Sequence, residues 1–318
     1  DCSAINTGLH AAALRAICPS AAQKKTPVRD LAYPPLRYSL FSGEATLLPA
    51  QAVFCNYNAA ASHELVLCEP NVSGAASAVS EEDAIKFAVY ELVERDAFLL
   101  TWLKSKTPAK INTAGIHDPE SRRLIDEARR FGLEPHILDI TSDIPIPAYM
   151  VALTGKTPPM VSRGFSANLN AVLAIRKGLS EALGNYIFNC RLISALQAGQ
   201  ELPASPMAER YQLWLKPESF EHFRFLLAGP ETKFEGRAVE NGQELAELER
   251  IFMERGPGYE IYYYNAHQPI FDKLGLSVVK ALIPALAPMY FREENAPLTY
   301  ANPRLGNTAI NTYPHPFA

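Results

Sequence analysis

Apolar and polar residues recur with two different periods along the chain, and these periods predict helices and strands. Apolar positions three or four residues apart indicate amphipathic helices, which are expected after Ser80 to about Leu103, at Glu120–Phe131, at Asn170–Leu196 and at Gln243–Arg255. Short runs rich in β-branched and aromatic residues indicate strands, which are expected at Gln51–Tyr57, Leu65–Cys68, Glu134–Ile140, Ala148–Leu153, Met160–Ser166, Tyr259–Asn265 and Ser277–Ile283. Strands and helices alternate without a regular repeat, so the pattern predicts a mixed α/β (α+β) fold, with mixed sheets and helices packed around one core.

The remaining segments carry weaker patterns. Residues 1–45 lack a strong periodicity and predict one short helix near Ala11–Ile17, whereas Phe271–Leu274 predicts a turn or short helix. Residues 201–220 contain several prolines and predict a surface excursion: Pro203, Pro206 and Pro217. Because the pattern predicts layers around one core, we expect a single domain over residues 1–318.

A run of small residues, Asn71–Val79, precedes the first long helix. Small side chains allow the backbone to approach a ligand or another element closely. Ser80 is a favourable N-cap for the helix that follows, and Asp83, three residues later, completes a shortened capping box.

Composition narrows the possible functions. The chain has 318 residues, 48% hydrophobic and 20% charged, with a formal net charge of −4. Without a basic excess, broad binding to nucleic acid or to an anionic membrane is not expected, and no apolar run is long enough for a transmembrane helix. The cysteines are scattered without a Cys-x-x-Cys pair, which predicts reduced thiols in a cytoplasmic protein.

The first long helix carries a group of charged residues on one face. Glu91 and Glu94 are three residues apart, Arg95 follows Glu91 by four, and Asp83 lies about two turns earlier on the same side. One interpretation is a surface helix whose Glu–Arg pairs contribute about 0.3–0.5 kcal/mol each. The other is a Mg²⁺ site, because a hard cation takes oxygen ligands and cancels the repulsion between close carboxylates.

Two further patterns carry candidate chemistry. The helix at Asn170–Leu196 places Lys177, Glu181 and Asn185 on one stripe. The chain ends in Pro314-His315-Pro316-Phe317-Ala318, in which the two prolines favour a stiff, extended conformation. His315 is a candidate base. No Gly-x-x-x-x-Gly-Lys-Ser/Thr phosphate loop and no Gly-x-Gly-x-x-Gly motif occurs.

Together, the Glu91-x-x-Glu94-Arg95-Asp96-Ala97 motif, the Gly178–Asn185 stretch, the Leu276–Pro284 strand and the proline-rich tail resemble the YcaO family, and the tail resembles its azoline-forming cyclodehydratase branch. The resemblance runs from about Leu47 to the end. It implies a YcaO-like fold and an ATP- and Mg²⁺-dependent enzyme that hydrolyses ATP to ADP and phosphate. A Cys, Ser or Thr side chain closes onto an activated peptide amide, giving the thiazoline or oxazoline rings of thiazole/oxazole-modified microcins and other ribosomal peptide natural products.

The resemblance also implies roles for particular residues. The Mg²⁺ ligands would be Asp83, Glu91, Glu94 and Glu181, and the nucleotide contacts would be Arg95, Glu181, Asn185 and Arg304. The tail residues Pro314, His315, Pro316 and Ala318 would reach the active site and assist proton transfer.

The chain departs from the family pattern at several positions. Gly184 stands where a Gln is expected beside Glu181, and Ala318 stands in place of a final Pro. An earlier Gly-Lys-Gly stretch and a first Glu-x-x-Glu-Arg helix are not found in residues 1–45. Either the chain is shortened at its N-terminus, or another subunit supplies that half of the site, or nucleotide binding is lost.

The implied partners are a precursor peptide and a separate leader-binding, E1-like protein, and a homodimer is possible. Two alternatives stay open. A thioamide- or amidine-forming YcaO enzyme would use the same activated amide with a different nucleophile. A non-catalytic YcaO-like scaffold subunit would explain the departures from the family pattern.

Overall fold

A computed structural model of the chain describes residues 37–40, 43, 45–46, 48–58, 68–236, 242–266, 268–307 and 309–317. They form two compact units: the first comprises residues 1–96 and 240–307, and the second residues 97–239 and 308–318. The helix expected near Ala11–Ile17, most of the strand expected at Leu65–Cys68, and Ala318 lie outside the described residues. The single-domain organisation stays a prediction.

An antiparallel sheet forms the centre of the first unit. Its strand order is β2-β1-β9-β10-β3, with β1 at Arg37–Ser39, β2 at Ala45–Thr46, β3 at Ala75–Ala78, β9 at Tyr262–Asn265 and β10 at Ser277–Leu282. The register of β3 and β10 places Lys280 opposite Ala75. The helical segments of the unit are α3 (Ala50–Val53), α8 (Glu244–Met253), α9 (Pro269–Leu274), α10 (Ala296–Tyr300) and the 3-10 turns η4 (Glu293–Asn295) and η5 (Pro303–Leu305).

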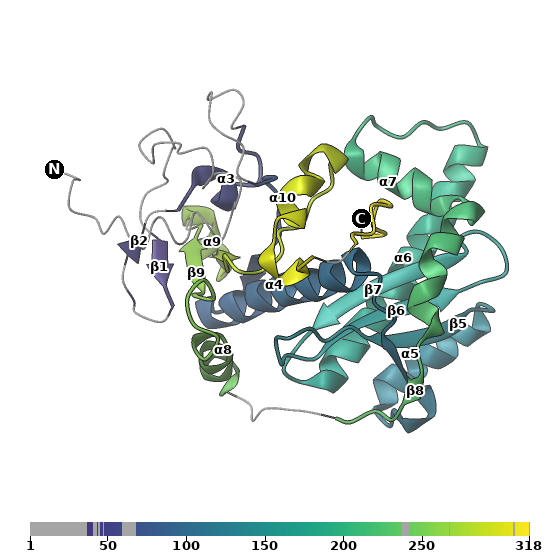
Figure 1. The fold of residues 1–318 in the computed structure, drawn as a ribbon, viewed down its shortest axis with the longest axis horizontal. Helices are drawn as coiled ribbons and strands as arrows, with labels where there is room; N and C mark the ends of the chain where they lie inside the picture. Colours follow the sequence, from purple (N-terminus) through teal and green to yellow (C-terminus); the bar gives the residue numbers. More distant parts are fainter. Residues whose placement is uncertain are drawn as a thin grey trace. The chain divides into compact units, whose positions relative to one another are not determined.

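The second unit contains a mixed sheet in the order β7-β6-β5-β4-β8. Its strands are β4 (Ala109–Ile111), β5 (Glu134–Asp139), β6 (Ala148–Thr154), β7 (Val161–Ala167) and β8 (Glu231–Thr232), and only β4 and β8 pair in parallel. Helices α5 (Pro119–Arg130) and α6 (Ala171–Gln197) lie against this sheet (Figure 1). Their apolar residues form one buried cluster with those of the strands. The 3-10 segments η2 (Thr113–Gly115) and η3 (Pro217–Ala228) complete the unit together with α7 (Pro206–Leu215).

Helix α4 (Glu81–Leu103) is the long helix that the sequence predicts after Ser80. The Asp83 N–H donates to Ser80 Oγ at 3.1 Å and Ser80 Oγ donates back to the Asp83 carboxylate at 2.7 Å, so the predicted cap is present. Within α4, the residues up to Asp96 belong to the first unit and the residues from Ala97 onward belong to the second. Its charged motif therefore lies in the first unit and its aromatic end in the second.

Close packing between α6 and β7 depends on two glycines. A Cβ added to Gly164 would lie 2.1 Å from the Gly178 carbonyl oxygen and 2.5 Å from the Ala182 nitrogen. No side chain fits there, because atoms cannot approach so closely. The helix therefore rests directly on the strand and brings its side chains within reach of the strand's main chain.

The structure corrects three predictions of local structure. Gln51–Tyr57 is not a strand, because helix α3 occupies Ala50–Val53. The small-residue run contains strand β3, which the sequence did not predict. Residues 201–220 are not a surface excursion throughout, because α7 buries Arg210 and Trp214. Among the described helices, none is both long and apolar enough to cross a lipid bilayer.

Candidate functional site

The first unit holds Glu91 in a fixed position on α4. One carboxylate oxygen of Glu91 pairs with Arg95 Nη2 at 2.7 Å, and the other accepts the N–H of Gly74 at 2.7 Å. Charge-assisted hydrogen bonds of this kind are stronger than those between neutral groups. Glu91 therefore connects the helix to the loop that precedes β3.

The loop requires glycine at position 74. Gly74 has a φ of +77°, and a Cβ there would lie 2.6 Å from the Ala281 carbonyl oxygen and 3.0 Å from Leu92. Its own carbonyl accepts the N–H of Ala281 at 2.7 Å. The absence of a side chain lets the loop pass between α4 and β10, as the run of small residues suggested.

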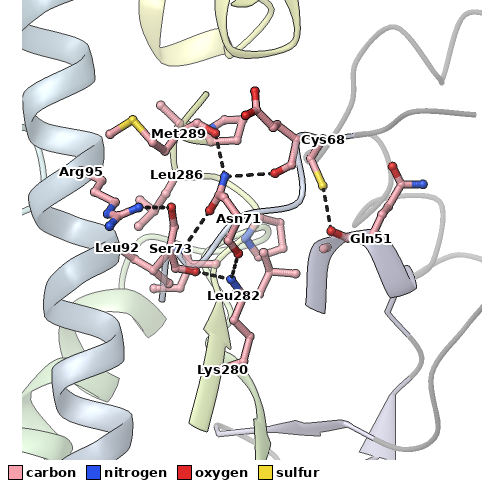
Figure 2. A pocket seen from close by; sticks show the side chains of 16 residues that line it. Gln51, Cys68, Asn71, Ser73, Leu92, Arg95, Lys280, Leu282, Leu286 and Met289 are labelled. Carbon is pink, nitrogen blue, oxygen red and sulfur yellow. Dashed lines mark hydrogen bonds between the residues drawn. The ribbon is translucent and has the colours of Figure 1, made fainter. Parts of the chain in front are cut away.

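Side chains on both sides of the loop bind its polar groups (Figure 2). Arg95 Nη1 donates to Ser73 Oγ at 2.6 Å. The Asn71 side chain accepts the Ser73 N–H at 2.8 Å and donates to the carbonyls of Glu69 and Met289. Lys280, on β10, donates to the carbonyls of Asn71 and Ser73 at 2.8 and 2.5 Å.

Lys280 is an ammonium group in largely apolar surroundings. Its burial lowers its pKa to about 8, although the nearby Glu91 carboxylate acts in the opposite direction. The two carbonyl oxygens satisfy two of its three donors. The amine therefore remains mostly protonated at neutral pH and loses its proton more readily than an exposed lysine does.

A cavity of about 70 Å³ lies beside this loop. Its lining combines cationic and thiol groups with apolar side chains, among them Cys68, Leu92, Arg95, Lys280 and Leu286 (Figure 2). The Cys68 thiol is buried and donates to the Gln51 carbonyl at 3.7 Å. An apolar cavity with a few converging polar groups is the usual form of a small-molecule site.

Asp96 and Arg304 form an anchor deeper in the first unit. Asp96 is fully buried, and one of its carboxylate oxygens accepts both the N–H of Ala287 at 2.8 Å and Arg304 Nη1 at 2.5 Å. Arg304 was predicted to contact a nucleotide, and the structure places its guanidinium on Asp96. Its predicted role stays a prediction.

The predicted metal ligands occupy different surroundings. Glu94 is 5% exposed on α4. Hydrogen bonds from Lys86 and, to a lesser extent, from Ser80 lower the pKa of Asp83. In the part of the chain that the structure describes, no three His, Cys, Asp or Glu side chains are grouped closely enough to hold a metal ion. The assignment of Asp83, Glu91, Glu94 and Glu181 as ligands therefore stays a prediction.

Glu181 and Asn185 bind the main chain of β7 in the second unit. Glu181 Oε2 accepts the Phe165 N–H at 3.1 Å, and Asn185 Nδ2 donates to the Arg163 carbonyl at 2.8 Å. Both contacts follow from the close approach of α6 at Gly164. These side chains are ordered by the strand, and their predicted contacts with a nucleotide or metal stay untested.

The final segment of the chain is held within the second unit. Its main-chain carbonyls accept hydrogen bonds from Trp102, Trp214 and Arg210. His315 is 0% exposed, and its ring lies edge-on to Phe98 at a centroid distance of 5.8 Å. The described part of the tail has no helix or strand, as the prolines at 314 and 316 predict.

The sequence analysis did not identify several residues around the Ser73–Gly74 loop and around the final segment. Lys280 is the one charged residue within the apolar β10 pattern, and this was a usable signal for a functional or structural role. Asn71 and Ser73 lie in the small-residue run, which was noted but not assigned. Arg210 and Trp214 carried no signal, because they lie in a proline-containing segment far from the tail in sequence.

Comparison with known proteins identifies the family. The sequence model described as YcaO cyclodehydratase, ATP- and Mg²⁺-binding, matches residues 33–287. This description names the two cofactors that the sequence predicts. An uncharacterized protein of Methanothermobacter thermautotrophicus is 26% identical over 147 residues, which are 45% of this chain and 38% of the relative.

Solved structures share the fold. A structure described as a heterocyclase in complex with substrate and cofactor matches with a TM-score of 0.69 and 21% identity, over 89% of this chain and 38% of that chain. The E. coli microcin synthetase McbBCD complex with pro-MccB17 bound matches with a TM-score of 0.66 and 20% identity, over 96% of this chain and 74% of that chain.

These matches confirm the predicted mixed α/β, YcaO-like fold. The chain spans 38% of the length of both the Methanothermobacter relative and the heterocyclase. Because the family model matches well over half of the sequence, including the Glu91–Arg95 motif, the chain belongs to the YcaO family.

Proposed function

We propose that this chain is the ATP- and Mg²⁺-dependent catalytic part of a peptide cyclodehydratase, which forms thiazoline or oxazoline rings from Cys, Ser or Thr. The main support is the organised contact between Glu91, Arg95 and the Ser73–Gly74 loop in a chain of the YcaO family. The fold shared with a heterocyclase agrees with this proposal. The proline-rich final segment favours ring formation over thioamide or amidine formation.

Glu91 and Glu94 would hold the Mg²⁺ ion. Mg²⁺ in phosphate-transfer sites is usually bound by one or two carboxylates, with phosphate oxygens and waters as the other ligands. A ready-made group of three carboxylates is therefore not required. Each carboxylate has about four lone-pair sites, so the two hydrogen bonds of Glu91 leave capacity for a metal. The ion would neutralise charge on the phosphates.

Arg95 and Lys280 would assist on the protein side. Both are cations beside the cavity, and the planar Arg95 guanidinium is already oriented by Glu91 and Ser73. We place the phosphates next to this cavity and not inside it, because about 70 Å³ is too small for a nucleotide and phosphoryl transfer depends mainly on positioning and on charge stabilisation.

The proposed reaction activates the amide oxygen as a phosphate leaving group. The substrate side-chain thiol or hydroxyl attacks the carbonyl carbon of the preceding peptide bond and loses its proton to a base. The resulting oxyanion takes the terminal phosphoryl group of ATP, releasing ADP. The C–O bond then breaks, phosphate leaves with the former amide oxygen, and loss of the amide proton gives the C=N bond of the azoline. A precursor peptide and a separate leader-binding protein are the proposed partners, in line with the peptide-bound microcin synthetase complex.

The test is a precursor peptide labelled with ¹⁸O at the carbonyl before a Cys, incubated with the full chain, its leader-binding partner and Mg·ATP. We expect the peptide to lose one water per ring and the label to appear in inorganic phosphate. Glu91→Gln should abolish both signals, whereas Glu127→Gln on the surface of α5 should not. A peptide that keeps both its label and its mass would contradict the proposal and indicate a scaffold. With sulfide added, loss of the label together with a net gain in mass from incorporated sulfur would also contradict it and indicate thioamide formation.

A further inference from the structure

Three side chains of the second unit donate hydrogen bonds to three consecutive carbonyls of the final segment. Trp102 Nε1 donates to the Tyr313 carbonyl at 3.0 Å, Trp214 Nε1 to the Pro314 carbonyl at 3.1 Å, and Arg210 Nη1 to the His315 carbonyl at 2.9 Å. The donors come from α4 and α7, which are distant in sequence from the tail. We call these three donors the carbonyl clamp.

The clamp is built into the protein interior. Trp102, Trp214 and Arg210 are 0%, 4% and 4% exposed. A buried donor without an acceptor costs about 1–3 kcal/mol, so these side chains favour a conformation in which the tail is present. The match between buried donors and tail carbonyls shows that the segment is a specific occupant of this site.

The conformation of the tail suits such a clamp. Proline carries no N–H, and an extended proline-containing segment makes no internal hydrogen bonds, so its carbonyls remain available. Neighbouring contacts fix the side chains: the His222 ring stacks on Tyr313 with 3.6 Å between centroids, and the Phe165 ring stacks on Phe317 with 4.6 Å. The carbonyls that the clamp binds lie between the two stacked residues of the tail, Tyr313 and Phe317.

His315 occupies the position that the clamp determines. Its carbonyl is bound by Arg210, and its ring is enclosed next to Phe98. Since the three hydrogen bonds of the clamp go to main-chain carbonyls, they place residue 315 independently of its side chain.

We propose that Trp102, Trp214 and Arg210 are positioning residues that fix the course of the tail for the proposed cyclodehydration. The inference rests on the proposed function for the reaction that the tail serves, but the clamp itself can be tested separately. The chain has only two tryptophans, and both are clamp donors. Tryptophan emission therefore reports on the docking of the tail without any assay of activity.

The experiment compares the full chain with Arg210→Met, which keeps much of the apolar stem and removes the donor. We expect its tryptophan emission to shift to longer wavelength and hydrogen exchange in residues 309–317 to accelerate. We also expect kcat for ring formation to fall at least about tenfold, with KM for ATP changed less than about threefold, because the role proposed for the tail is in ring formation and not in nucleotide binding. Arg210→Lys, which restores a cationic donor, should recover part of each signal.

Two further variants keep the result interpretable. Trp214→Phe retains an aromatic ring and removes one donor, but it also removes one of the two fluorophores. It is therefore compared by hydrogen exchange in residues 309–317 and by kcat, which should change in the same direction even if Arg210→Met fails to fold by circular dichroism. Arg224→Met makes the same chemical change on the exposed surface of η3 and should match the wild type.

The outcomes separate the two proposals. A folded Arg210→Met chain with wild-type emission and exchange, together with a folded Trp214→Phe chain with wild-type exchange, would overturn the clamp. A shifted emission with wild-type kcat would overturn the positioning role. A wild-type chain that forms no ring with its peptide and partner would overturn the proposed function and with it the positioning role, while emission and exchange would still decide whether the clamp holds the tail.

Discussion

Lys280 is a half-buried, positively charged residue in a strand whose other side chains are mostly apolar. Burying an ammonium group is unfavourable unless it is hydrogen-bonded, and the carbonyls of Asn71 and Ser73 supply those bonds. Lys280 therefore ties β10 to the loop that contacts Glu91. A substitution here affects both the stability of the first unit and the order of the loop.

The first prediction concerns pH. The pKa of Lys280 is lowered from 10.5 to about 8. Between these values the unfolded chain holds a proton that the folded chain has lost, so the free energy of unfolding rises with pH across this window. Urea unfolding of wild type and Lys280→Met from pH 7.5 to 10.5 should show the wild type gaining stability relative to the variant. Lys273→Met on α9 serves as the control, and parallel curves for Lys280→Met would contradict the lowered pKa.

The second prediction concerns Gly74. Gly74→Ala should destabilise the protein by about 2 kcal/mol or more, because the alanine would be strained in a left-handed backbone conformation and its Cβ would clash with the Ala281 carbonyl. Gly132→Ala is a matched control, because Gly132 has a φ of +73° and open space around it. It should cost only about 1 kcal/mol. If urea unfolding showed that both variants lose the same free energy of unfolding, the close approach of Gly74 to the Ala281 carbonyl would not contribute to stability.

At the scale of elements, Asp118 joins two helices of the second unit. Its carboxylate caps α5 by accepting the Ser121 N–H at 2.8 Å and pairs with Arg176 of α6 at 2.7 Å. The Arg176 guanidinium is the main cause that lowers the pKa of Asp118 to about 2. The same side chain thus starts one helix and fixes its neighbour.

The third prediction separates these two roles. Asp118→Asn keeps a capping oxygen and loses the ion pair, whereas Asp118→Ala loses both and should cost about 1 kcal/mol more. Because the folded pKa is depressed, the ion-pair contribution is present above the ordinary value near 3.8 and disappears as the pH falls through 2. The difference between wild type and Asp118→Asn in thermal unfolding should therefore shrink below pH 4. A difference that is independent of pH would contradict the pairing.

Long elements with a local pattern could be predicted from sequence, and short or non-local ones could not. The bounds of α5 and α6 differ from the prediction by only one residue at each end. The prediction is close because the caps and the apolar spacing depend on neighbouring residues in the sequence. The residues of β3, Ala-Ala-Ser-Ala, have no strand propensity of their own and become a strand by pairing with β10, about 200 residues away. In α7, the proline that suggested a loop stands in the first turn, where it is tolerated.

At the scale of the whole molecule, the candidate sites depend on contacts that span much of the sequence. The motif identified Glu91 and Arg95 because the pair lies within one helical turn. Asp96 and Arg304 are separated by 208 residues, and Arg210 and His315 by 105. Nothing in the local pattern connects such pairs, so the sequence could name the acidic helix but not the residues that organise its surroundings.

The fourth prediction concerns the stability of the entire chain in the presence of nucleotide. A ligand that binds only the folded state at a hundredfold excess over its Kd stabilises it by about 2.7 kcal/mol. A non-hydrolysable ATP analogue with Mg²⁺ should therefore raise the unfolding temperature of the wild type but not of Glu91→Gln. Mg²⁺ alone and the nucleotide alone are the controls. An equal rise in Glu91→Gln would remove this residue from the proposed metal site.

The contacts of Glu181 and Asn185 with β7 have a consequence for solubility. This strand lies at the end of its sheet, and the two side chains occupy main-chain groups that another chain could otherwise pair with, a common route to aggregation. A Glu181 variant made to test metal binding would therefore risk precipitation for reasons unrelated to catalysis. Asn185→Leu, which removes a comparable contact, would show how much of any loss comes from self-association.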